Sequence, residues 1–212
     1  GPQNWLMLYA LAHWAFGPSK LLEQVTQEAL EKVMPGLLNG TESMCFGLSE
    51  PNAGSDASMI KTKATRDGDG WRISGRKIWT TNAPIADYCV IFAVTDSALA
   101  EQKKGGITAF IAPTDSPGFT VQRIIKLFGH VGGDEAELAF DDLYVEPWQV
   151  VGELNKGFEA ALYGVSLGRI YNSARAVGYG RWAIELALSY AKTREAFGSN
   201  IASYQGVSFP LA

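Results

Sequence analysis

The sequence has few cysteines, no long apolar run and no excess of positive charge, and each absence argues against a class of protein. Its 212 residues include two cysteines, Cys45 and Cys89, which are too few for a disulfide framework. The best candidate for an apolar span, residues 6–16, is shorter than a membrane-spanning helix and contains His13. The formal net charge is -4, whereas nucleic-acid binding requires a basic face. We therefore expect neither a membrane span nor a nucleic-acid partner.

Histidines are scarce as well. His13 and His130 lie far apart, and neither has a cysteine or carboxylate at ligand spacing, so no metal site is expected. The hydrophobic fraction of 47% and the charged fraction of 19% are typical of a globular protein. A chain of this length can bury a substantial core as one large domain or two small ones.

The first part of the chain has a helical pattern. From Gln3 to about Leu38 the apolar residues recur at helical spacing, and Pro35-Gly36 is predicted to end the run. The predicted buried face consists of Leu21, Leu22, Val25, Ala29 and Val33.

From Met44 to about Val151 the pattern shortens into strands separated by turn residues. The segment Asp67-Gly-Asp-Gly70 is a strong hairpin signal between two of them. The predicted strands are 59–65, 71–79, 88–94, 107–111, 120–123 and 137–145. Short strands with regular turns favour a compact antiparallel barrel or sandwich.

After Gly157 the helical period returns and continues to a break at Phe197-Gly198. The order of elements predicts an α+β multidomain fold: a helical segment, an antiparallel β-barrel or sandwich, and a helical C-terminal segment. The expected domains are the end of a helical domain at 1–40, a middle β-domain at 41–152 and the start of a second helical domain at 153–212. Apolar helical patterns meet both chain ends, so a fragment of a longer protein is expected.

Two neighbouring blocks in the middle region could bind a flat polar ligand. In the first, Ser49-Glu-Pro51 is followed by Gly54-Ser-Asp56, which offers a sharp turn, hydroxyls and room for close backbone approach. The second, Lys77-Ile-Trp-Thr-Thr-Asn82, offers an indole and two hydroxyls at a strand end. The alternatives are an ordinary loop for the first block and a core tryptophan at Trp79 for the second.

A third block, Tyr190–Gly198 followed by Gln205, could bind a diphosphate. The guanidinium of Arg194 can donate two parallel hydrogen bonds to phosphate oxygens. The alternative is a plain helix end, with basic residues that complement the helix dipole and Gly198 as the cap.

Together, the spacing of these blocks closely resembles the acyl-CoA dehydrogenase family. The resemblance implies FAD as cofactor, with the Leu48 and Ser49 region facing the pyrimidine end of the flavin. It further implies that Trp79 packs on the flavin ring and that the Thr81 hydroxyl reaches its N5 edge. The implied cofactor-binding residues are Phe46, Leu48, Ser49, Gly54, Ser55, Trp79, Thr81, Arg194, Phe197 and Gln205.

The resemblance also implies substrate contacts and assembly. Ser55, Ser166 and Arg169 correspond to substrate-binding positions, although an isolated helix arginine is more commonly a surface residue. Arg194 corresponds to a residue that binds the FAD diphosphate of a neighbouring subunit, so a homodimer or homotetramer is expected. Gly168 stands where a minority of the family has its glutamate base. The catalytic base is therefore expected beyond residue 212, and no catalytic residue within this chain.

The chain departs from the family pattern at several positions. Ser49 stands where threonine is common, and Ser166 stands where relatives often have aspartate. Val131 and Glu135 stand where relatives often carry arginine and threonine.

The resemblance predicts an FAD-dependent enzyme that dehydrogenates an acyl-CoA between its α and β carbons and passes the electrons to an electron-transfer flavoprotein. The alternatives are an acyl-CoA oxidase or related flavin oxidase on the same fold, and a non-catalytic paralogue. The low cysteine content favours a reducing compartment. With the resemblance, this suggests the cytoplasm of a bacterium or the mitochondrial matrix rather than secretion.

Overall fold

The computed structural model describes residues 21–128 and 134–212, and the chain divides into two compact units, one up to Gly168 and one from Arg169 to Ala212. The predictions for His13, His130 and Val131 lie outside the described residues, as does the first half of the predicted N-terminal helical run.

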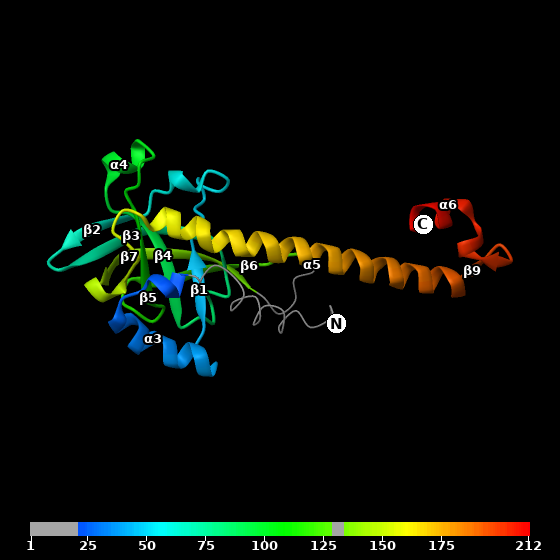
Figure 1. Ribbon diagram of the computed structural model, residues 1–212, viewed down its shortest axis with the longest axis horizontal. Coiled ribbons are helices and arrows are strands. Elements are labelled where there is room, and N and C mark those ends of the chain that lie inside the picture. The colour runs from blue at the N-terminus through cyan, green and yellow to red at the C-terminus, as the bar shows by residue number, and fades with distance from the viewer. Residues whose placement is uncertain (1–20, 129–133) are drawn as a thin grey trace. The chain divides into compact units, whose positions relative to one another are not determined.

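The first unit is built on an eight-stranded sheet (Figure 1). Seven strands follow one path in the order β6-β7-β3-β2-β4-β5-β8, and β1 pairs with β4 outside that path. The strands are β1 (Met44–Gly47), β2 (Lys63–Asp67), β3 (Gly70–Thr81), β4 (Tyr88–Val94), β5 (Ile107–Pro113), β6 (Phe119–Ile125), β7 (Glu135–Val145) and β8 (Val150–Val151). Helices η1 (Leu22–Gln24) and α3 (Gln27–Asn39) precede the first strand. The short helices η2 (Ala57–Met59), α4 (Ser97–Glu101) and η3 (Pro147–Gln149) lie between strands.

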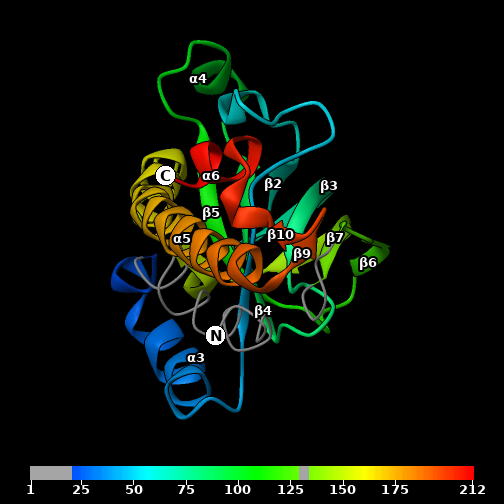
Figure 2. The same cartoon turned by 90° about the vertical axis from the view of Figure 1, so that its right-hand side faces the viewer.

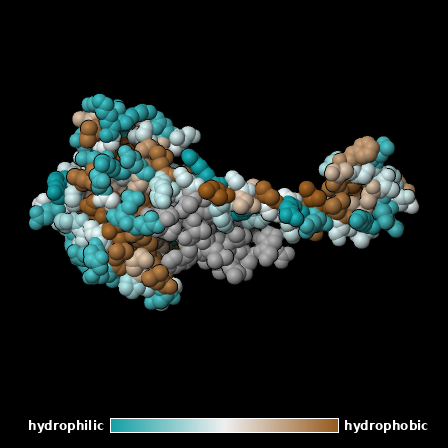
Figure 3. Space-filling model, viewed as in Figure 1, coloured by the Kyte–Doolittle hydropathy of each residue, from teal (hydrophilic) through white to brown (hydrophobic). Residues whose placement is uncertain are grey.

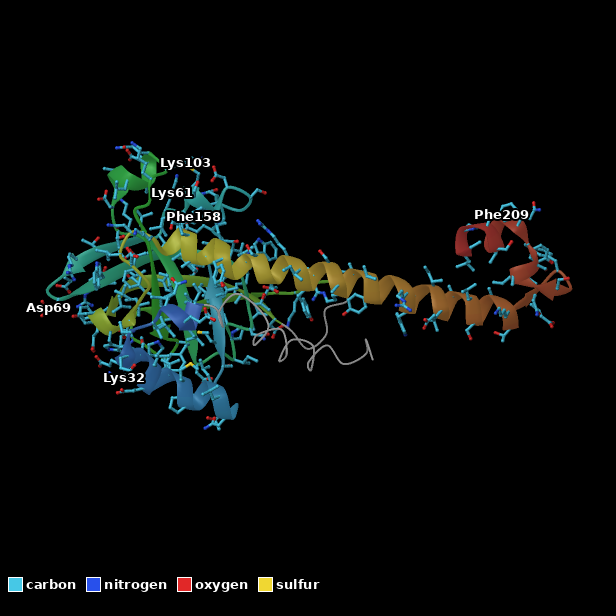
Figure 4. The ribbon with its side chains drawn as sticks, in the orientation of Figure 1. Lys32, Lys61, Asp69, Lys103, Phe158 and Phe209 are labelled. Carbon is cyan, nitrogen blue, oxygen red and sulfur yellow. The ribbon has the colours of Figure 1, made fainter. Side chains whose placement is uncertain are left out.

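Most pairings in this sheet are antiparallel, but β4 pairs in parallel with β1 and with the start of β2. The strand pattern read from the sequence did not contain these parallel pairings, because they join segments that are not neighbours along the chain. The predicted hairpin is confirmed: Asp67 pairs with Gly70 across a two-residue turn in which Gly68 has φ +59°. Asp69 lies at the tip of this hairpin (Figure 4).

Two hydrophobic clusters lie on opposite faces of β4, because successive strand residues point to opposite sides of a sheet. Cys89, Ile91 and Ala93 belong to a cluster that also contains residues of β3, β5 and β7, so the curved sheet encloses it. Val90, Phe92 and Val94 belong to the other cluster, which is covered by α3 and the first turns of α5 (Gly157–Thr193). Figure 2 shows α3 on the β4–β5 side of the sheet, away from β6 and β7. The enclosed cluster is consistent with the predicted barrel or sandwich.

Helix α3 buries the predicted residues Ala29 and Val33, but its end was predicted wrongly. Pro35-Gly36 does not stop the helix, which continues to Asn39 and is capped by Gly40 at φ +77°. Proline within a helix costs one hydrogen bond, and burial of Val33 and Leu37 against the sheet offsets that cost. Leu21 and Leu22 are also buried, although they precede α3.

The second strand also begins later than the sequence predicted. β2 starts at Lys63, whereas residues 57–59 form the 3₁₀ turn η2. The cause lies in the loop opposite, because the Glu50 carboxylate accepts hydrogen bonds from the backbone N–H groups of Lys61 and Thr62. These groups are therefore bound by a side chain rather than by a strand.

The first turns of α5 lie close against β5. A Cβ at Gly157 would come within 2.4 Å of the backbone nitrogen of Ala109, so the glycine permits this approach. Ala160 and Ala161 are buried in the cluster beneath α5, and Phe158 packs at its border (Figure 4).

The second unit contains the rest of α5, the short strands β9 (Glu195–Ala196) and β10 (Ser199–Asn200), η4 (Ile201–Ser203) and α6 (Gln205–Leu211). Within it, Ala191 is the only buried side chain among the residues that the structure describes. Large apolar side chains of α5 are exposed, including Ile170, Val177 and Leu186. Figure 3 shows hydrophobic residues on the surface of this helix.

Candidate functional site

The Ser-Glu-Pro segment forms the tight turn that the sequence predicts. Glu50 and Ala53 exchange two backbone hydrogen bonds of 3.0 Å each around Pro51-Asn52. The carbonyl oxygen of Ser49 accepts from the Ile78 backbone N–H at 2.9 Å. The turn is therefore tied to β3 one residue before Trp79, so the structure brings the first two sequence blocks together.

A buried ion pair between Lys77 of β3 and Glu50 of the turn holds this turn against β3. Lys77 Nζ lies 2.8 Å from Glu50 Oε1 and 3.1 Å from the Leu48 carbonyl oxygen, and Lys77 is fully buried. Burial lowers the pKa of Lys77 to about 8, although the Glu50 carboxylate opposes the shift. Burial acts to raise the pKa of Glu50, but attraction and hydrogen bonds from Lys77, Thr62 and the Lys61 backbone outweigh it, so this pKa is lowered. Both residues lie in the sequence blocks, yet their pairing was not predicted.

Trp79 is exposed to solvent, which contradicts the alternative that it is a core residue. Its relative exposure is 53% and its φ is +60°, in the left-handed region that bulky residues rarely adopt. The pairing of β3 with β7 shifts register between Lys77 and Thr80, and this bulge turns the indole out of the sheet. Strained residues of this kind cluster at functional sites, because the fold must hold them there at a cost.

The two hydroxyls after Trp79 have different surroundings. Thr80 is fully buried and its Oγ1 has no hydrogen-bond partner within the described part of the chain, so it is not available to an outside ligand. Thr81 is partly exposed, and its Oγ1 lies 2.8 and 2.9 Å from the two carboxylate oxygens of Glu135. Of the two hydroxyls predicted to face a ligand, only the Thr81 hydroxyl lies in a residue that is accessible from outside.

The other predicted residues of the first unit are Phe46, Leu48, Gly54, Ser55 and Ser166. Phe46 and Leu48 are half-buried against the cluster under α5, and the Phe46 ring packs on Phe92 at 4.9 Å between centroids. Gly54 and Ser55 follow the Glu50–Ala53 turn and are exposed, with open space where a Cβ on Gly54 would lie. Ser166, on α5, donates its hydroxyl to the Leu162 carbonyl oxygen at 2.8 Å.

The second unit carries the remaining predicted residues, Arg169, Arg194, Phe197 and Gln205. Arg169 is exposed on α5. The helix ends at Thr193, and Phe197 and Gly198 form the turn of a β9–β10 hairpin with φ values of +51° and +79°. Gly198 is therefore not a helix cap, which removes the alternative reading for that residue.

The hairpin presents its polar and aromatic residues outward. Phe197 is 99% exposed, although its backbone lies in the left-handed region. Arg194 is exposed, with its backbone N–H bonded to the Tyr190 carbonyl oxygen and its own carbonyl to the Ile201 N–H, both at 2.8 Å. Gln205 opens α6 and is exposed. The Arg194 guanidinium and the Phe197 ring are therefore both exposed and accessible to a ligand.

Across residues 21–128 and 134–212, every helix is too short or too polar to span a bilayer.

Comparison with known proteins identifies two matching domains and several relatives. The middle domain of acyl-CoA dehydrogenases matches residues 45–143, and their C-terminal domain matches residues 155–212. A probable acyl-CoA dehydrogenase of Bacillus subtilis is 39% identical over 93% of this chain and 52% of its own length. A subunit of the caffeyl-CoA reductase-Etf complex of Acetobacterium woodii is 35% identical over 93% of this chain and 51% of its own.

The fold is shared with solved structures as well. Butyryl-CoA dehydrogenase from Megasphaera elsdenii superposes with a TM-score of 0.86 at 36% identity, over 94% of this chain and 52% of that one. The chain thus spans about half the length of the curated relatives it matches. The two domain matches and this shared fold show that the chain belongs to the acyl-CoA dehydrogenase family.

Proposed function

We propose that the protein is an FAD-dependent acyl-CoA dehydrogenase, which oxidises the bond between the α and β carbons of an acyl-CoA thioester. The observation that carries the proposal is Trp79, whose exposed indole stands in a strained bulge beside the Ser49 turn. A fold gains nothing in stability from an exposed tryptophan at φ +60°, whereas a flat ring stacked on it would cover that surface.

The residues of the first unit fit a flavin. Trp79 offers an apolar face, Ser49 a hydroxyl on the turn beside it, and Gly54 open space for a polar group. The Thr81 hydroxyl lies two residues from Trp79 and would face the reactive edge of the ring. When bound, the flavin supplies the electron sink that accepts a hydride from the substrate. In the second unit, Arg194, Phe197 and Gln205 would bind the FAD diphosphate of a neighbouring subunit.

The substrate residues are proposed in the same way. Ser55 on the turn and Ser166 and Arg169 on α5 would contact the acyl-CoA. Gly168, which precedes Arg169, cannot remove a proton, so the general base is not supplied from that position. We place the base outside these 212 residues.

The partners follow from the same proposal. The sequence similarity to a subunit of a caffeyl-CoA reductase-Etf complex supports an electron-transfer flavoprotein as the electron acceptor. A homodimer or homotetramer would let Arg194 reach the site of a second subunit. The thiols of Cys45 and Cys89 are free and buried, which is compatible with a reducing compartment such as the bacterial cytoplasm or the mitochondrial matrix.

The test is FAD binding by the full-length protein. We expect a flavin absorption band that shifts when acyl-CoA is added. Trp79→Ala and Trp79→Gly should both weaken FAD binding roughly 10- to 100-fold, because burying an aromatic ring contributes about 1.5–3 kcal/mol. The glycine variant should be about 1 kcal/mol more stable than the alanine variant, because glycine accepts a positive φ without strain.

Tyr144→Ala is the matched control, since Tyr144 is a partly exposed aromatic residue at the opposite end of the β3–β7 pairing. It should leave FAD binding unchanged. A protein that stays colourless with FAD refutes the proposal. Rapid formation of hydrogen peroxide by the reduced protein in air would favour an oxidase on the same fold instead.

A further inference from the structure

The Thr81 hydroxyl, which is predicted to face the N5 edge of the flavin, donates its hydrogen bond to the Glu135 carboxylate. Thr81 and Glu135 are directly opposite on β3 and β7, and the hydroxyl oxygen lies 2.8 and 2.9 Å from the two carboxylate oxygens. A hydroxyl has one proton and an ionised carboxylate can only accept. While Glu135 is ionised, the Thr81 proton is therefore directed at Glu135, and only the hydroxyl lone pairs face outward.

The Glu135 side chain is an unusual buried carboxylate. It is 8% exposed and has no cationic partner within the described residues. The cationic side chains on and just after β6 pair with other carboxylates. On β6, Arg123 lies 3.0 Å from Glu137, and Lys126 beyond it lies 3.4 Å from Asp134. Burial raises the pKa of Glu135, and the Thr81 hydrogen bond opposes this shift. His130 is close in sequence but lies outside the described residues.

We propose that Glu135 is a positioning residue that holds the Thr81 proton away from the flavin and thereby makes the bound cofactor harder to reduce. The inference rests on the proposed function, because it takes Thr81 to face the flavin. Reduction adds negative charge to the flavin ring. An ionised carboxylate near the ring opposes that charge. A hydroxyl whose single proton is already donated to Glu135 cannot donate it to the ring. A glutamine at position 135 removes the charge, and its amide N–H can donate to the Thr81 oxygen, which leaves the hydroxyl proton free to face the ring.

The experiment measures the two-electron midpoint potential of the FAD-loaded full-length protein. Glu135→Gln keeps the shape of the side chain and removes its charge. It should shift the equilibrium toward reduced flavin at least tenfold, which corresponds to about +30 mV for a two-electron couple. The potential of the wild type should also show a pH-dependent step that Glu135→Gln abolishes and His130→Gln preserves.

Glu137→Gln is the matched control. Glu137 lies two residues further along β7 and carries the same charge, but its carboxylate is paired with Arg123. Its effect should stay below twofold. In a Thr81→Val background, Glu135→Gln should lose more than half of its effect if it acts through the hydroxyl. An unchanged potential in Glu135→Gln, or an equal shift in Glu137→Gln, would overturn the inference, as would a full effect in the Thr81→Val background.

The outcomes separate this inference from the proposed function. A protein that binds no FAD refutes both. A protein that binds FAD with a potential indifferent to Glu135 retains the proposed function and refutes the inference. Thermal unfolding of each variant shows whether a shifted potential reflects a damaged fold, and Glu135→Gln should melt no lower than the wild type because it removes an unpaired buried charge.

Discussion

At the scale of single residues, a buried ion pair holds the turn of the candidate site in place. Lys77 and Glu50 come from different elements, yet they meet beneath the turn that carries Leu48 and Ser49. A buried ion pair contributes little net stability compared with apolar residues, but removing one partner leaves the other as an uncompensated charge. The pair therefore acts mainly to hold the Ser49 turn against β3.

We predict that Lys77→Met destabilises the protein by about 3–5 kcal/mol near neutral pH, as for other broken buried pairs. Arg76→Met removes the same charge from an exposed neighbour and should change stability by less than about 0.5 kcal/mol. The double variant Glu50→Gln/Lys77→Met should be more stable than Lys77→Met alone. Urea unfolding measures all three, and a small effect for Lys77→Met would show that the pair does not hold the turn.

The pH dependence of these variants has a definite sign. In the wild type the folded-state pKa of Glu50 is lowered, so its stabilisation is complete above the ordinary glutamate pKa and is lost as pH falls through the folded value. In Lys77→Met burial remains without the cation, so this pKa should rise above its ordinary value and stability should increase as pH falls. The stability gap between the two proteins should therefore narrow from about pH 6 to about pH 3. A stability gap that does not change with pH would show that Lys77 does not lower the pKa of Glu50.

At the scale of elements, helix α5 has two halves with different surroundings. Its first turns bury Ala160 and Ala161 against the sheet, whereas beyond Gly168 most side chains are exposed, including Ile170 and Val177. Helices that are apolar on several sides are normally buried by neighbours. Without them, a helix of this length is marginal in water, because most helical stability in proteins comes from packing.

We predict that hydrogen exchange in this 212-residue chain separates the two halves. Backbone amides of 169–187 should exchange at least about tenfold faster than those of 157–168, and β4 and β5 should exchange most slowly. Peptide-level mass spectrometry resolves these segments, and α3 provides a comparison helix that is packed on the sheet. Equal protection along α5 would show that its second half is stabilised in the chain itself.

At the scale of the whole molecule, we propose that a second subunit completes the cofactor site. Arg194 and Phe197 lie in the unit that follows Gly168, and Phe197 is 99% exposed although its backbone has a positive φ of +51°. Binding of FAD across two subunits would make cofactor affinity and association depend on each other.

We predict that Arg194→Ala in the full-length protein lowers FAD affinity at least tenfold, because a hydrogen bond to a charged group contributes about 1.5–3 kcal/mol. Subunit association should weaken in parallel. Sedimentation velocity with and without FAD measures the link, and Arg181→Ala, which removes an exposed arginine from the same unit, is the control. A holoprotein that sediments only as a monomer would contradict the prediction.

Local pattern was enough to locate most elements. Strand β4 has the predicted bounds Tyr88–Val94, and the hairpin at Asp67–Gly70 and the helical run after Gly157 are present as well. These features depend on alternation, helical period and turn residues, which are properties of neighbouring positions. The same spacing of short motifs was sufficient to indicate the family.

Tertiary structure alone decided how those motifs meet. The exposure of Trp79 depends on a bulge in the β3–β7 register, and the pairing of Thr81 with Glu135 joins residues 54 positions apart. The Lys77–Glu50 pair joins residues 27 positions apart. A sequence pattern fixes which face of a strand a residue occupies, but register and bulges are set by packing between distant segments, and these decide which side chains share a site.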